Sequence, residues 1–193
     1  MINSFGPGEK PGTDYYDCRY NVLRKPLGFE RGAEILQDDG DAVHAFVEKQ
    51  ERVVAVGRAH LIPAQSDGSQ ADHAGPGAAK CPAFGPLTGP GFRPAIQIRQ
   101  MGTLGDFQRQ GFAAMVLAKL EEEAIEKFAA TTGFLQAREH AIPFYLSQGW
   151  EIIDEEYSIP NIGPHRSMMK QLCLLYTSPS PRDRSLSRMP SSA

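Results

Sequence analysis

Residues 101–113, which read MGTLGDFQRQGFA, are the part of this chain best suited to bind a phosphate. They join a strand-like segment to the start of the most regular helical pattern in the sequence. A helix start carries about half a positive charge and several N–H groups without an intrahelical acceptor. Gly111 has no Cβ, so a phosphate can approach the backbone closely. Arg109, between Gln108 and Gln110, adds a charge, and the stretch therefore predicts a pyrophosphate site.

The same residues also suit a plain tight joint between a strand and a helix, and this alternative stays open. Two other nucleotide-binding motifs are disfavoured. No Lys-Ser or Lys-Thr pair follows Gly111, which argues against a P-loop. The spacing is not G-x-G-x-x-G, which argues against a dinucleotide-binding fold.

Together with segments downstream, the chain resembles the GNAT superfamily of acetyl-CoA-dependent N-acetyltransferases. Its motif Q/R-x-x-G-x-G/A is matched by Gln108, Gly111 and Ala113, after a strand ending in Met-Gly-Thr where Met-Ala-Val is common. Residues 137–150 (AREHAIPFYLSQGW) resemble the family element A-x-x-F-Y-x-x-x-G-F/Y. Residues 162–170 (IGPHRSMMK) resemble the ending of an ElaA-like branch. The resemblance spans about residues 15–172.

The resemblance implies a mixed, mostly antiparallel central sheet flanked by helices, with acetyl-CoA bound where the fourth and fifth strands splay apart. Pantetheine would pair with the strand that ends at Thr103. The pyrophosphate would lie on residues 108–113, which we name the cradle. The residues that would bind the coenzyme are Met101, Thr103, Gln108, Arg109, Gln110, Gly111, Phe112 and Ala113. No metal is implied.

The implied reaction is direct transfer of an acetyl group from acetyl-CoA to the amine of a small molecule or peptide. Tyr145 would protonate the departing thiolate, or else pack with Phe144 in a helix. Cys18 and Cys81 lie outside the motifs, so neither is a natural nucleophile. Two alternatives stay open: a non-catalytic acyl-CoA-binding sensor with this fold, and an interaction protein that binds no coenzyme.

The acceptor side is less defined. His165 could be the general base, line the acceptor pocket or serve the structure alone. Glu139 and Glu155 could attract a cationic amine, whereas Arg99 and Arg138 could instead bind an acidic acceptor group, and the residues do not decide between them. The net acidity mildly favours a cationic acceptor.

Several positions depart from the family pattern. Arg109 replaces the usual cradle glycine, Gln108 replaces a frequent arginine, and His140 stands where asparagine is common. A first strand before Tyr15 is expected in the family and is not evident in the sequence.

Hydrophobic periodicity supplies the elements that must position these residues, and it predicts one α/β domain over residues 14–172. Its sheet must be mixed, because parallel neighbours need a helical crossover. The predicted order is helix 14–27, a hairpin of 42–48 and 52–62, strand 95–103, helix 111–130, strand 133–137, helix 141–148, and strands 150–157 and 166–172.

Three segments fall outside this pattern. Residues 1–13 are predicted to be disordered, and residues 64–93, dense in Gly, Pro, Ala and Ser, to form a long flexible loop. Residues 173–193 resemble a translated sequencing adapter: 173–183 match a transposon end with its read primer, and 187–193 match a flow-cell adapter. The alternative is a disordered tail rich in Ser, Pro and Arg. Either way we exclude this segment from fold reasoning.

Composition narrows the class of protein. A net charge of −3 argues against a protein made mainly to bind nucleic acid, and no apolar run approaches a membrane span. Three cysteines without a C-x-x-C pair fit a reducing compartment, so we expect the cytoplasm. The sequence leaves open whether the protein is a monomer or a homodimer.

Overall fold

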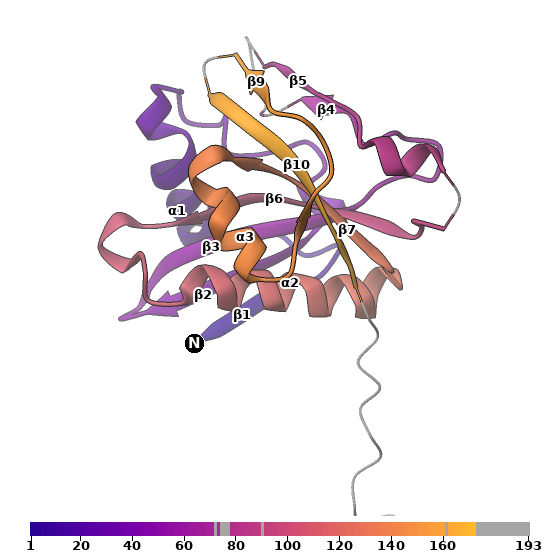
Figure 1. Ribbon diagram of the computed structural model, residues 1–193. Coiled ribbons are helices and arrows are strands. Elements are labelled where there is room, and N and C mark those ends of the chain that lie inside the picture. Colours follow the sequence, from indigo (N-terminus) through magenta and orange to yellow (C-terminus); the bar gives the residue numbers. More distant parts are fainter. Residues whose placement is uncertain (72, 74–77, 90, 161, 173–193) are drawn as a thin grey trace, which may run out of the picture.

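The computed structural model describes residues 1–71, 73, 78–89, 91–160 and 162–172, and shows one large sheet with helices on both faces (Figure 1). The strands follow the order β1-β2-β3-β6-β7-β10-β8, and β9 also pairs with β10. Their bounds are β1 Ile2–Phe5, β2 Val43–Lys49, β3 Arg52–Leu61, β6 Ala95–Thr103, β7 Thr132–Arg138, β8 Glu151–Ile152, β9 Tyr157–Ile159 and β10 Gly163–Gln171.

One pair of neighbouring strands in this sheet is parallel, namely β6 and β7. They are joined by the long helix α2 (Phe112–Phe128), which supplies the crossover that parallel strands require. The other pairs recorded for the sheet are antiparallel. The prediction of a mixed, mostly antiparallel sheet flanked by helices is therefore confirmed.

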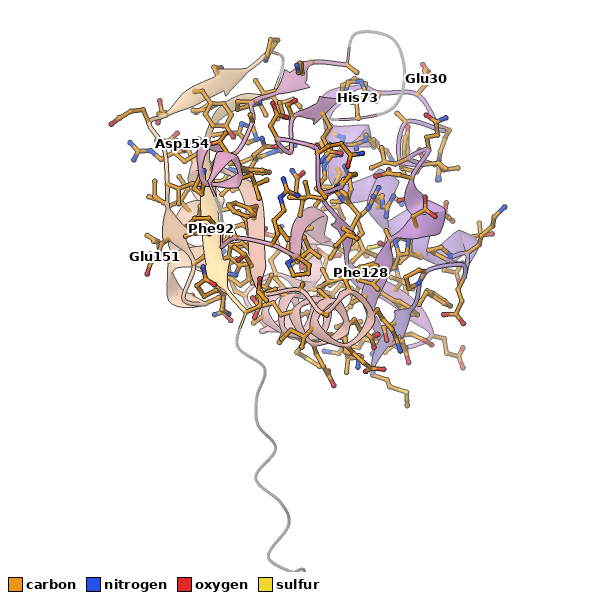
Figure 2. All side chains as sticks on the ribbon, turned by 90° about the vertical axis from the view of Figure 1, so that its right-hand side faces the viewer. Glu30, His73, Phe92, Phe128, Glu151 and Asp154 are labelled. Atoms are coloured by element: carbon orange, nitrogen blue, oxygen red, sulfur yellow. The ribbon has the colours of Figure 1, made fainter. Side chains whose placement is uncertain are left out.

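The two helical layers differ in how they are held. Helix α2 covers one face through an apolar core that includes Val116, Leu117 and Leu120, whose side chains are at most 1% exposed. Helix α1 (Thr13–Leu23) packs behind the sheet against β3 and β6. Viewed along α2, with Phe128 at its near end, His73 lies on the far side of the molecule from that helix (Figure 2).

A buried charge network ties α1 to the sheet. Arg19 binds Asp39 at 2.9 Å, and Arg58 of β3 binds Asp38 at 2.7 Å and Asp39 at 3.0 Å. The His44 Nδ1 lies 3.4 Å from the Arg19 guanidinium, and its Nε2 donates to the Asp39 carbonyl at 2.8 Å. Both arginine side chains are fully buried, so paired carboxylates offset the loss of their hydration.

The N-terminal segment corrects two expectations, because Ile2–Phe5 forms an edge strand paired along β2. The first strand that the sequence did not reveal is therefore present, and residues 1–13 are not disordered throughout. Phe5 stacks on Phe46 with ring centroids 5.3 Å apart, and Ser4 donates to Glu123 of α2. Such contacts join residues far apart in sequence, so four residues of mixed polarity give no local signal.

The segment between β3 and β6 also differs from the flexible loop that we expected. Its described residues include the pair β4 (Gln70–Ala71) and β5 (Lys80–Cys81), and the 3-10 turn Gly85–Thr88. Phe84 is fully buried in a small core with Phe134 of β7, at 5.0 Å between ring centroids. Aromatic anchors hold this segment, which we name the 64–93 excursion, to the sheet face opposite α2.

Smaller differences concern element ends. Helix α1 ends at Leu23 rather than at residue 27, and Lys25–Leu27 forms a separate 3-10 turn. The strand expected over 150–157 is interrupted, leaving β8 and β9. The adapter-like segment 173–193 lies outside the described residues. Among the helices described here, none has the length and apolar character needed to span a bilayer.

Candidate active site

The parallel strands β6 and β7 separate shortly after they begin. Their pairing ends at Gln97 and Phe134, yet β6 runs on to Thr103 and β7 to Arg138. A bulge in β6 accompanies the divergence, because Gln100 and Met101 together oppose the single residue Gly57 of β3. Gln100 has a φ of 56°, and bulges of this kind bend a strand and re-aim its side chains. The sheet is therefore split between β6 and β7 at one end.

The split leaves backbone groups of β6 without a strand partner on the β7 side. The Leu104 N–H donates to the Val54 carbonyl of β3 at 2.9 Å. Because successive residues alternate in direction, the N–H and C=O of Thr103 face away from β3. The Gln108 side chain reaches the Thr103 carbonyl at 3.4 Å. The Thr103 hydroxyl is buried and has no hydrogen-bond partner among the described residues.

The loop after β6 ends at the N-terminus of α2. It contains the 3-10 turn Gly105–Phe107 and then the exposed residues 108–111. Gly111, the N-cap, has a φ of 82°, and no side chain caps the helix. Within the described chain, no acceptor is recorded for the backbone N–H groups of residues 109–114. These N–H groups lie at the positive end of a 17-residue helix, where an anion could accept hydrogen bonds from them.

Arg109 also adopts the left-handed conformation, with a φ of 58°. That conformation costs a residue with a Cβ about 1–2 kcal/mol, whereas glycine adopts it without this cost. This geometry explains why a glycine usually stands at this position in the family that the sequence resembles. In exchange, Arg109 places an exposed cation beside the helix N-terminus.

A second cation at this site was missed in the sequence. The Lys49 ammonium, at the end of β2, lies 3.2 Å from Gln110 Oε1 and 5.3 Å from the Phe112 ring centroid. Gln110 is held in turn by a bond to the Asp106 carbonyl. Lys49 and Gln110 are 61 residues apart, so no local pattern could have revealed the contact. Phe112 and Ala113, the other predicted coenzyme contacts, are half-buried in the first turn of α2.

Tyr145 lies on the short helix α3 (Ile142–Ser147), which follows β7 and the 3-10 turn Glu139–Ala141. Its ring meets Trp150 edge-on at 6.2 Å and belongs to the core that includes α2. The hydroxyl has no hydrogen-bond partner recorded in the described part of the chain. Burial raises the pKa of Tyr145 well above its ordinary value. The phenol therefore stays protonated at neutral pH and can donate a proton.

His165 lies on β10 and is 5% exposed. Its Nδ1 is 2.8 Å from the Gly163 carbonyl, which can only accept, so Nδ1 carries the proton. In the neutral ring, Nε2 is then the basic atom. Tyr157 of β9 stacks on the ring at 6.3 Å between centroids. The imidazole is thus held in one orientation and one tautomer.

The two predicted catalytic residues lie on opposite faces of the sheet. Tyr145 shares its core with Leu135 and Ala137 of β7. His165 is directly opposite Arg138, which alternates with these residues and shares a face with Phe134. Groups from the two faces can meet where β6 and β7 have separated, so the arrangement can serve a reaction between two molecules that approach from different faces.

The remaining candidate residues from the sequence differ in their surroundings. Glu139 and Glu155 are exposed, and Arg99 donates to the Ala71 carbonyl in the 64–93 excursion. His44 and His60 are buried. Among the residues that the structure describes, no cluster of His, Cys, Asp or Glu could hold a metal ion.

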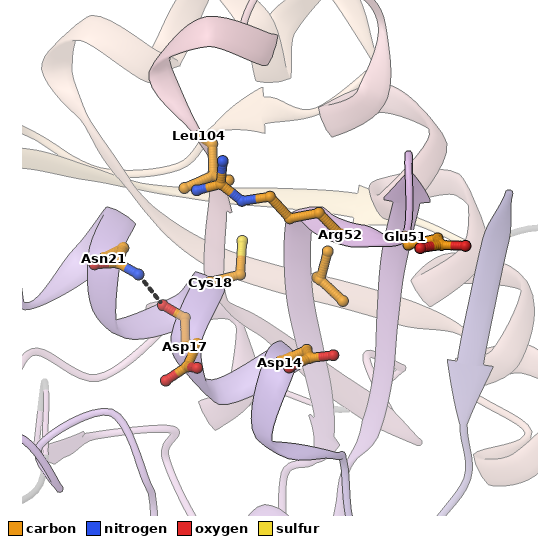
Figure 3. Close-up of a pocket in the computed structure, with 8 residues that line it drawn as sticks. Asp14, Asp17, Cys18, Asn21, Glu51, Arg52 and Leu104 are labelled. Carbon is orange, nitrogen blue, oxygen red and sulfur yellow. Dashed lines mark hydrogen bonds between the residues drawn. The ribbon is translucent and has the colours of Figure 1, made fainter.

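A cavity of about 280 Å³ lies beside α1 and the β2–β3 hairpin rather than at His165 (Figure 3). Its lining includes Asp14, Asp17 and Glu51, together with Cys18 and Arg52. Burial raises the pKa of the Cys18 thiol to about 12, so this cysteine is not a nucleophile.

Comparison with known proteins adds independent information. A sequence model described as the acetyltransferase (GNAT) family matches residues 12–150. The uncharacterized N-acetyltransferase YitI of Bacillus subtilis strain 168 is 32% identical over 78 residues, which are 40% of this chain and 52% of that relative. The match therefore spans about half of the relative's length.

Solved structures share the fold at lower identity. Escherichia coli ElaA superposes with a TM-score of 0.59 at 17% identity, covering 89% of this chain and 100% of that chain. An aminoglycoside 6'-N-acetyltransferase complexed with coenzyme A gives 0.60 at 13% identity, covering 90% and 98%. These likenesses extend over almost the whole of each solved chain.

Proposed function

Because this chain belongs to the acetyltransferase (GNAT) family, we propose that it transfers an acetyl group from acetyl-CoA directly to an amine. The observation that most supports this proposal is the split between β6 and β7. The split leads to the N-terminus of α2, where backbone N–H groups have no recorded acceptor among the described residues. Cys18 and Cys81 are buried and form no disulfide, which supports direct attack and a reducing, cytoplasmic setting. We expect the protein to be a monomer or a homodimer.

The residues of the cradle fit a coenzyme diphosphate. The N–H groups of residues 109–113 would hold the phosphates, with Arg109 and Lys49 supplying charge. A Cβ at Gly111 would meet no atom within 4 Å, so the space in front of the backbone is open. The free edge of β6 at Met101 and Thr103 would hold the pantetheine arm. Bound acetyl-CoA supplies the activated thioester.

The two faces of the sheet would then supply different catalytic groups. His165 Nε2 accepts the proton that the amine loses as its nitrogen forms the new bond to the acetyl carbon. Tyr145 donates its proton to the sulfur as the carbon–sulfur bond breaks, and regains one from solvent. A general acid positioned in this way contributes about 100- to 10,000-fold in rate.

A turnover assay tests the proposal. The full chain, incubated with acetyl-CoA and a broad panel of amines, should release free coenzyme A thiol and yield acetylated amine by mass spectrometry. Coenzyme release only through slow hydrolysis, with tight coenzyme binding and no acetylated amine, would instead support the acyl-CoA-binding sensor.

A further inference from the structure

Arg138, the last residue of β7, differs from the buried Arg19 of α1 and the buried Arg58 of β3. Arg19 and Arg58 are each bound to aspartates. Arg138 is half-buried, yet within the described chain no hydrogen bond or ion pair is recorded for it. Burial alone lowers the pKa of its guanidinium. A cation removed from water without a counter-charge is destabilising unless a ligand supplies that charge.

The position of Arg138 connects it with the reacting groups. In the antiparallel register it is directly opposite His165, and His165 is directly opposite Tyr157. The three side chains therefore form a row on one face of the sheet. Arg138 also lies four residues beyond Phe134, where pairing with β6 ends. Met101 lies four residues beyond Gln97, so the two are at a similar height along the split.

The chemistry of the row is complementary to a molecule with two functional groups. The guanidinium presents parallel N–H donors that match the two oxygens of a carboxylate or of another oxyanion. His165 Nε2 is the basic atom of its ring. Directly opposed residues in an antiparallel pair have Cβ atoms about 4.5–5.5 Å apart. A ligand that meets both groups therefore carries its amine and its acid only a few bonds apart.

We propose that Arg138 binds the acid group of the acceptor, and that the acceptor is a small amino acid or a similar amine with a neighbouring oxyanion. The proposal rests on the acyltransferase function proposed above and names the substrate class for the same site. Arg138 sets specificity, because its charge attracts the acid group and repels an acceptor that carries a second cation near its reactive nitrogen. Exposed Glu139 and Glu155 do not offset this charge, because both lie in water.

Matched acceptors test the proposal kinetically. L-Alanine, ethylamine and 1-aminoethylphosphonate share a skeleton, and L-leucine with 3-methylbutylamine repeats the comparison with more apolar bulk. Coenzyme A release is measured as kcat/KM per concentration of neutral amine. The amino acids should exceed their decarboxylated partners by about 10- to 100-fold, the range for a lost charged hydrogen bond. The phosphonate distinguishes a carboxylate site from one that takes a phosphate-like group.

Variants assign the preference to one side chain. Arg138→Gln should lower kcat/KM for L-alanine about 10- to 100-fold and change the ethylamine value by less than about threefold. Arg138→Lys keeps the charge but loses the parallel N–H donors of the guanidinium, so it should retain part of the preference for L-alanine over ethylamine. Lys127→Gln, which removes an exposed cation near the end of α2, is the matched control. Equal losses for both acceptors, or no preference in the parent protein, would overturn the proposal.

A binding measurement separates failure of this proposal from failure of the acyltransferase function. Saturation-transfer NMR should detect N-acetyl-L-alanine on the parent protein and not on Arg138→Gln, with N-ethylacetamide weaker on both. That result supports the acid site even in a protein without turnover. If neither compound binds, or if N-acetyl-L-alanine binds both proteins equally, the acid site is wrong, whatever acetyl-CoA does.

Discussion

The two halves of β6 show how one strand can serve both structure and chemistry. Residues 95–98 are buried and the first three of them pair with β7, whereas residues 99–103 are half-buried and have no partner on β7. The bulge at Gln100 and Met101 follows the end of the pairing with β7. In the first half, backbone groups on both sides are used by the sheet. In the second half, one side is available to a ligand.

The comparison explains why the fold tolerates an open sheet in its centre. The loss of pairing after Gln97 is offset by the crossover helix α2, whose core reaches Leu135 and Tyr145 across the split. Stability should therefore depend on the closed half and chemistry on the open half. Variants can separate these two properties.

The largest expected effect is on chemistry in the open half. Tyr145→Phe removes the proton donor and should lower kcat about 100- to 10,000-fold, with little change in coenzyme affinity. Tyr20→Phe, which removes a phenol on α1 that donates to the Phe29 carbonyl, is the matched control. Unchanged kcat in Tyr145→Phe would remove this residue from the mechanism and favour a packing role.

The closed half should respond in stability instead. In Gly133→Val the new Cβ would lie 2.8 Å from the Trp150 ring and 3.5 Å from Ile96. Overpacking of this kind costs about 1–3 kcal/mol of unfolding free energy, measured by urea denaturation. Gly85→Ala, where a Cβ meets no atom within 4 Å, serves as control. An unchanged unfolding midpoint would contradict the assignment of this half to structure.

The cradle should respond in coenzyme affinity. Gly111→Val introduces a side chain at a φ of 82° and in front of the N–H groups. We expect acetyl-CoA to bind about 10- to 30-fold more weakly by calorimetry, because strain of about 1–2 kcal/mol adds to obstruction. Gly105→Ala, in the same loop and without a positive φ, should keep its affinity. Equal affinities in all three proteins would place the diphosphate elsewhere.

The last prediction concerns the pH dependence of stability. Burial lowers the pKa of His44 to about 4 and of His60 to about 3, from 6.5. Below pH 6.5 the unfolded chain takes up protons that the folded protein does not, so the unfolding free energy falls as the pH falls toward 4. The slope reaches up to about 1.4 kcal/mol per pH unit for each histidine.

Urea denaturation between pH 6.5 and pH 5 measures this slope. His44→Gln should reduce it, whereas His140→Gln, at an exposed histidine, should not. A flat profile in the parent protein would show that these imidazoles are not held neutral in the fold.

Much of the architecture was predictable from the sequence, and the family match confirms the resemblance read from Gln108, Gly111 and Ala113. Periodicity located α2, the β2–β3 hairpin and β6, because amphipathic patterns follow local geometry. It missed β1, whose four residues are stabilised by pairing with β2. It also missed the excursion's anchor Phe84, because one aromatic residue among glycines and prolines gives no periodic signal.

The site was less predictable than the fold. Motifs supplied the cradle and Tyr145, but the opposite faces of Tyr145 and His165 follow from strand register, which the sequence does not state. Lys49 reaches the cradle from a distant hairpin. The net acidity of the chain favoured a cationic acceptor, whereas the local charge at Arg138 favours an acidic one. Whole-chain charge is a poor guide to a single site.

Thermal unfolding of the full chain with and without acetyl-CoA tests the central claim most directly. A ligand at about 100 times its dissociation constant adds roughly 2.7 kcal/mol, which raises the midpoint by several degrees. We predict this rise with acetyl-CoA and its absence with adenosine, which lacks the diphosphate and pantetheine. A folded sample whose midpoint does not move at millimolar acetyl-CoA would contradict a coenzyme site in the split between β6 and β7.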